Sequence, residues 1–173
     1  MDTLFGLPAH PLVVHGAVVL VPLAAIGTIT IALWGEARRR VGWIVVGLGA
    51  AAFVFTLMAQ ASGGSLEEKV DESPQSEEHR EQGDTMPWLA LPIVITAAGV
   101  MVLDRRRTSG DAESQPSWMG PAVIVVSAAA VLASVVGTVF IAQVGHSGAK
   151  ATWQEIQDNP QGDQGDESGE EGE

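Results

Sequence analysis

The stretch that decides the fold is His10-Pro11-Leu12-Val13-Val14-His15-Gly16-Ala17-Val18-Val19-Leu20-Val21-Pro22. It begins a run that continues to Gly35. Apart from the histidines, this run contains no acidic or basic side chain. About 20 apolar residues are enough for a helix to cross a bilayer. Ionisable side chains in or beside such a span are costly, and they mark candidates for function. The stretch therefore predicts a membrane helix with a chemically distinctive end.

The composition extends this prediction to the whole chain. Its 173 residues are 46% hydrophobic yet carry a net charge of −12, so apolar and acidic residues must be segregated along the sequence. We expect membrane spans at about residues 11–34, 41–62, 87–103 and 118–144. This pattern predicts an all-α integral membrane four-helix bundle in residues 1–153. Residues 154–173 are rich in Asp, Glu, Gln and Gly, and we expect a disordered acidic tail there.

The arginines predict the orientation of the bundle. Six of the nine basic residues lie in the short connections 37–40 and 104–117. The positive-inside rule makes these two connections cytoplasmic. Both termini and the acidic segment 67–84 are then extracytoplasmic. The sequence thus predicts a multi-pass membrane protein with an N-out, C-out topology.

Several classes of function are excluded or disfavoured. The absence of cysteine excludes disulfides, thiolate metal sites and iron–sulfur clusters within the chain. The acidic balance argues against binding of nucleic acid. We find no nucleophile–base arrangement, phosphate-binding loop or HExxH motif, and no charged residue mid-membrane that would favour a transporter. We therefore expect a protein that is not an enzyme in isolation.

All four histidines fall on the predicted outer side. His10 and His15 lie at the outer end of the first helix, His79 lies before the third, and His146 lies at the end of the fourth. We expect His15 to face the bundle, because an imidazole is poorly accommodated by lipid. His15 and His146 are the principal candidate ligands for a metal or haem, with His10, His79 and the neighbouring Glu78 as auxiliaries.

Two cofactor chemistries and one simpler explanation fit these residues. Haem b could be held between His15 and His146, which are predicted at similar depth. A zinc or copper site of imidazoles with Glu78 needs only a small cluster, and suits the rim of a bundle better. Alternatively, the histidines only form structural hydrogen bonds, as a histidine near a helix C-terminus does. The protein is then a structural or partner-binding membrane subunit without a cofactor.

The same residues carry a family resemblance. The motifs are His10-Pro11-x-x-Val14-His15, Ser62-Gly63 with Leu66-Glu67-Glu68-x-Val70, Glu78-His79-x-x-x-Gly83 and Val144-Gly145-His146-Ser147-Gly148-Ala149-Lys150. In combination they resemble domain of unknown function 2231, a bacterial four-helix membrane domain, over about residues 8–153. The resemblance implies a fold and a membrane location, and no established activity. Some relatives are fused to Rieske or cytochrome modules, which implies membrane redox proteins of respiration as partners.

Overall fold

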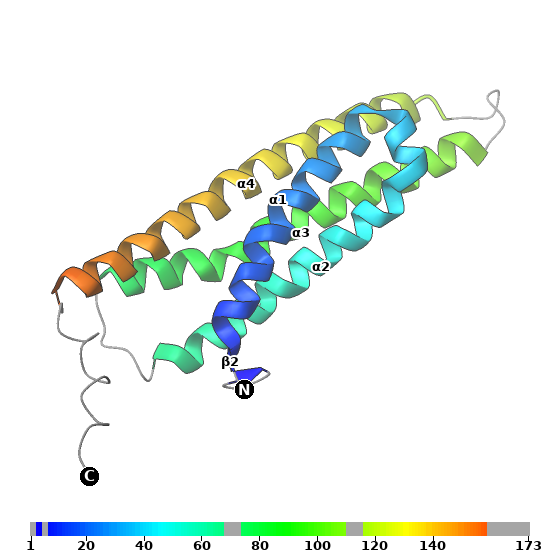
Figure 1. The fold of residues 1–173 in the computed structure, drawn as a ribbon. Helices are drawn as coiled ribbons and strands as arrows, with labels where there is room; N and C mark the ends of the chain where they lie inside the picture. The colour runs from blue at the N-terminus through cyan, green and yellow to red at the C-terminus, as the bar shows by residue number, and fades with distance from the viewer. Residues whose placement is uncertain (1–2, 5–6, 68–73, 110–115, 159–173) are drawn as a thin grey trace, which may run out of the picture.

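The computed structural model describes residues 3–4, 7–67, 74–109 and 116–158, with side chains described within 12–62, 81–109 and 116–150. Within these residues the chain forms four long helices, preceded by two paired two-residue strands (Figure 1). The strands are β1 (Thr3–Leu4) and β2 (Leu7–Pro8), and the helices are α1 (Ala9–Leu33), α2 (Gly35–Glu67), α3 (Pro74–Ser109) and α4 (Met119–Asp158). Consecutive helices run in opposite directions, so α1–α2 and α3–α4 are two hairpins.

Each helix contains a segment long and apolar enough to cross a membrane, and these segments cover residues 12–33, 35–62, 81–109 and 119–150. The predicted all-α membrane bundle with four spans is therefore confirmed. Large apolar side chains such as Ile44 and Ile124 are exposed on its outside. This is the surface that a bilayer covers in a membrane protein.

The helices are longer than the predicted spans. The arginine-bearing residues 37–40, predicted as a connection, belong to the first turns of α2, and only Trp34 separates α1 from α2. The Trp34 N–H donates to Thr30 O at 2.9 Å and the Arg38 N–H donates to Trp34 O at 3.0 Å, so helical hydrogen bonding continues through the corner. Charged residues mark the edge of the membrane, but arginine is a good helix former and does not end a helix.

The third helix shows the same extension at its other end. The polar residues before the short predicted span 87–103 are helical from Pro74. Pro87 and Pro92 both lie inside α3. The Thr96 hydroxyl donates to Pro92 O at 2.7 Å. At the far end of the chain, α4 continues to Asp158, past residue 154 where we expected the tail to begin; residues 159–173 lie outside the described residues.

The core is built from small and β-branched side chains. Its largest cluster includes Val21, Ala24 and Ala25 from α1, Ile93 from α3 and Ile141 from α4. Such residues let helix backbones approach closely, which is how packing stabilises helices in membranes. Gly137 of α4 lies at the same kind of contact. The helices approach so closely there that a Cβ on residue 137 would lie 2.9 Å from Ile93 Cδ1.

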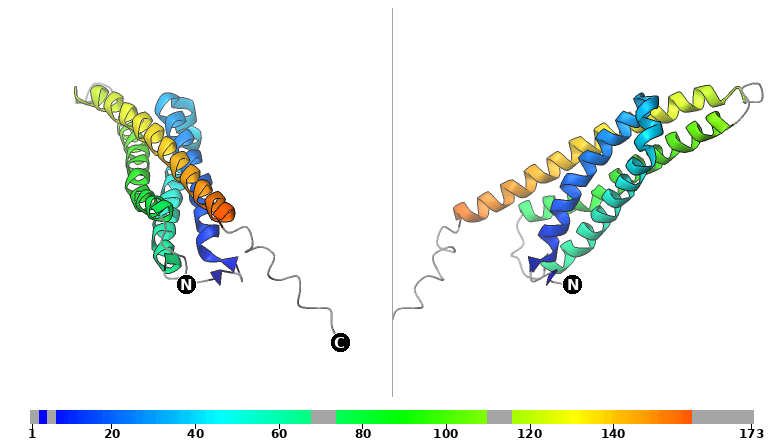
Figure 2. Two further views of the ribbon diagram at one scale, coloured as in Figure 1. Left: turned by 90° about the vertical axis from the view of Figure 1, so that its left-hand side faces the viewer. Right: turned by 45° about the vertical axis from the view of Figure 1, so that its right-hand side comes forward.

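The two hairpins cross at an angle (Figures 1 and 2). The first half of α1 runs away from the last half of α4 toward the end of the bundle at which α1 begins and α4 ends. That end is called the outer end below, after the side of the membrane on which the sequence predicts it to lie, and the end with the α1–α2 corner is called the arginine end.

Candidate functional site

The imidazole of His15 is exposed at the outer end of α1. Val13, Ala17 and Val21 are the buried residues of this part of the helix. His15 is two residues from Val13 and from Ala17, which is about 200° around a helix, so it lies on the opposite side. The expectation that His15 faces the bundle is therefore wrong.

His146 is also exposed, near the outer end of α4. Val144, two residues earlier, takes the buried position there. Gln143 and Lys150, about one turn to either side of His146, are exposed as well. The outer end of α4 thus presents a polar stripe centred on an accessible imidazole.

A polar contact next to His146 joins α4 to α3. The Ser147 hydroxyl donates to Gln82 Oε1 at 2.8 Å. On the other side of α3, Gln60 Nε2 of α2 donates to Asp84 O at 3.4 Å. The start of the α3 span therefore holds both α2 and α4 at the outer end. The sequence analysis did not predict this role for Ser147.

The auxiliary candidates His10, His79 and Glu78 have side chains outside the described residues. Their backbones lie on helices, His10 on the first turn of α1 and the other two on α3, about one turn before Gln82. The α3 pair is thus on the helix that contacts α4 beside His146, whereas the α1 histidines are on the helix that diverges from α4 (Figure 1). Within the described side chains, no three of His, Asp and Glu gather closely enough to hold a metal ion.

The arginine end contains an ion pair that the sequence analysis did not predict. Arg38 Nη1 donates to Asp104 Oδ1 at 3.0 Å, and the two side chains are only 10% and 23% exposed. Arg38 also donates from Nε to Ile31 O at 2.7 Å and from Nη2 to Ala32 O at 2.8 Å. These carbonyls belong to the last turn of α1, where intrahelical donors are lacking. One guanidinium on α2 therefore caps α1 and pairs with α3.

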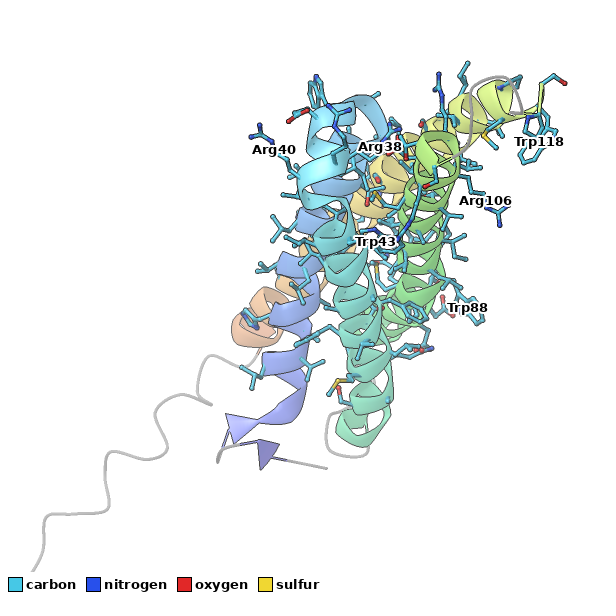
Figure 3. All side chains as sticks on the ribbon, turned by 90° about the vertical axis from the view of Figure 1, so that its right-hand side faces the viewer. Arg38, Arg40, Trp43, Trp88, Arg106 and Trp118 are labelled. Atoms are coloured by element: carbon cyan, nitrogen blue, oxygen red, sulfur yellow. The ribbon has the colours of Figure 1, made fainter. Side chains whose placement is uncertain are left out.

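The neighbouring arginines point to the outside. Arg39 and Arg40 both donate to Glu36, Arg40 at 2.8 Å, and their side chains are 67% and 76% exposed. Figure 3 shows the difference: Arg38 lies between helices, while Arg40 and Arg106 project away from the bundle. Exposed ion pairs of this kind contribute little to stability, because water screens the charges. Only Arg38 is therefore part of the packed structure.

Two buried hydroxyls lie near the middle of the bundle. Thr28 on α1 and Ser134 on α4 are both 0% exposed, and neither side-chain oxygen has a hydrogen-bond partner among the described residues. Ala32 of α1 and Ala130 of α4 lie in one buried cluster. Thr28 is one helical turn from Ala32, and Ser134 is one helical turn from Ala130. Both hydroxyl residues lie on the side of these alanines that is nearer the outer end. The two hydroxyls therefore stand at the same level of the α1–α4 contact.

Four membrane-length apolar helices, packed through small side chains and joined by a buried arginine, define a multi-pass integral membrane protein. The family described as predicted membrane protein (DUF2231) matches residues 6–157, and the chain belongs to this family. This confirms the resemblance found in the sequence. No curated protein and no solved structure matches the chain.

Proposed function

We propose that the protein is an accessory module of the bacterial cytoplasmic membrane that binds a transition-metal ion, zinc or copper, through histidines at its outer end. In this proposal the arginine end is cytoplasmic, as the positive-inside rule predicts, and both termini are extracytoplasmic. All four histidines then lie on the extracytoplasmic side, where the metal ion is taken up.

The observation that carries the proposal is the α3–α4 contact at the outer end. The Ser147 hydroxyl donates to Gln82 of α3, and the exposed imidazole of His146 immediately precedes Ser147 on α4. His79 and Glu78 lie one turn before Gln82 on the same α3. Imidazoles with a carboxylate are a ligand set that suits zinc and copper. In this proposal the ligands are His146, His79 and Glu78, and the auxiliary candidates His10 and His15 stand apart from them on α1.

A metal ion is favoured over haem b. A bis-histidine haem needs two imidazoles that face each other across the macrocycle between helices. His15 and His146 are both exposed, and the α1 start runs away from the α4 end (Figure 2). The geometry therefore supports the α3–α4 pair more than the α1–α4 pair.

The test is metal content and metal affinity of the detergent-purified full chain. We expect near-stoichiometric zinc or copper by elemental analysis, lost in His146→Ala and in His79→Ala and weakened at most a few-fold in His15→Ala. Gln143→Ala is a matched control, because it removes an exposed polar side chain one turn from His146 without removing an imidazole. Unchanged metal content in His146→Ala, with the helical circular dichroism preserved, contradicts the proposal. A Soret band lost in both His15→Ala and His146→Ala supports haem b instead.

A second candidate is a partner-binding membrane subunit without a cofactor. The exposure of His146 favours it, because an imidazole on the surface of α4 can contact another protein. The family resemblance directs attention to membrane redox proteins of respiration as partners. A folded, colourless and metal-free preparation, together with a site-specific photo-crosslink from position 143 to a membrane redox protein, supports this alternative.

A further inference from the structure

The outward-pointing arginines lead to an inference about the other end of the molecule. We propose that a basic collar binds the headgroups of anionic phospholipids. The collar consists of Arg39 and Arg40 on α2 and Arg105 and Arg106 on α3, all of which are exposed.

The first step is the charge of the collar. Glu36 accepts hydrogen bonds from Arg39 and Arg40 and offsets one of these two positive charges. Among the described residues, no carboxylate pairs with Arg105 or Arg106, because the nearby Asp104 is taken by Arg38. The four collar arginines with Glu36 thus carry three net positive charges. Asp111 and Glu113, further along the chain, lie outside the described residues.

The second step is the depth of the collar relative to the bilayer. Trp43 follows Arg39 by four residues and Arg40 by three, so it lies one turn further into the bundle on the same face of α2. It is exposed, as are Trp34 at the α1–α2 corner and Trp118 before α4. Tryptophan prefers the membrane–water interface. These three tryptophans mark the membrane–water interface. The collar arginines lie at this level or one turn closer to the water, which is the level of the lipid phosphates.

The third step is the choice of a lipid rather than a free anion. Arginine binds phosphate through its planar fork of donors, and a soluble phosphate site needs several such donors converging on one point. Arg40 and Arg106 instead point away from the bundle on different sides (Figure 3). A leaflet offers a phosphate to each of them separately. The arrangement therefore fits a membrane surface rich in phosphatidylglycerol or a similar anionic lipid.

The test uses quenching of tryptophan fluorescence by brominated lipids in reconstituted vesicles. Replacing Trp88 and Trp153 by Phe leaves only the three tryptophans near the collar as reporters. Dibrominated phosphatidylglycerol and dibrominated phosphatidylcholine are compared in mixed vesicles. Each arginine near an anionic lipid surface contributes about a fivefold preference for that surface over a neutral one. We therefore expect phosphatidylglycerol to be preferred about fivefold or more, and the preference to fall to near one when all four collar arginines become Gln.

Three controls separate the outcomes. Lys150→Gln, an exposed cation at the outer end, should leave the preference unchanged. About 0.5 M NaCl should weaken it in the unmodified collar, since salt screens exposed charges; this measurement stands even if the arginine variant fails to fold. Inorganic phosphate should lower the preference for phosphatidylglycerol no more than chloride does at equal ionic strength. Equal quenching by both lipids at low salt overturns the proposal, and specific competition by phosphate points to a free-anion site and also overturns it.

Discussion

Replacing Arg38 by Ala should destabilise the protein far more than replacing its neighbour Arg40. Arg38 makes three hydrogen bonds to two other helices from a side chain that is 10% exposed. Removing one partner of a buried ion pair costs about 3–5 kcal/mol, because the other charge is left buried. Asp104 is 23% exposed, so water reaches it and reduces this penalty. The loss of two caps on α1 carbonyls adds about 1 kcal/mol each at most. We expect a net loss of about 2–4 kcal/mol.

The assay is reversible unfolding by sodium dodecyl sulfate in mixed micelles, followed by tryptophan fluorescence. Arg40→Ala is the matched control, because it removes the same kind of side chain two residues away and only an exposed ion pair, which contributes little to stability. The double variant Arg38→Leu, Asp104→Leu should be more stable than the sum of its single changes predicts, since no charge is then left unpaired. Equal unfolding free energies for Arg38→Ala and Arg40→Ala would refute the reasoning.

Three further predictions concern packing and polar contacts. Thr28→Val should raise the unfolding free energy by about 1 kcal/mol, because it replaces a buried hydroxyl without a partner by a methyl group; a loss in the same micelle assay would reveal a hidden partner. Gly137→Ala should lower it by about 1–3 kcal/mol through the clash with Ile93, while Gly47→Ala, which has open space, should not; equal effects would contradict the close contact. Ser147→Ala should speed amide hydrogen exchange at the outer end of α4, with little change at the arginine end.

The sequence predicts the number of spans well and the ends of the helices poorly. Long apolar runs show where a bilayer is crossed, since the cost of polar groups in hydrocarbon is large. Hydropathy does not show where a helix ends, so it does not reveal that the arginines at 38–40 belong to α2. The boundaries depend on local hydrogen bonding, such as that around Trp34.

The candidate site was predictable only in part. The position of His15 and His146 toward the same end of the bundle followed from the topology, and the orientation of that end relative to the membrane stays a prediction. The side to which His15 points did not follow, because α1 is apolar all around and no stripe in its sequence distinguishes the inward face. The Arg38–Asp104 pair joins residues that are 66 positions apart, so it requires the packing of α2 against α3. The one local signal was a single carboxylate directly before the second arginine triplet.

The Arg38 contact also has a consequence for biogenesis. The α1–α2 hairpin is synthesised before Asp104, and its corner already contains a guanidinium that the finished bundle buries. Before α3 is present, the Arg38 guanidinium can still donate to the two α1 carbonyls, because both belong to the first hairpin. Its carboxylate partner, Asp104, belongs to α3 and becomes available only with the second hairpin. We therefore expect the first hairpin to hold its own corner and the ion pair to form last.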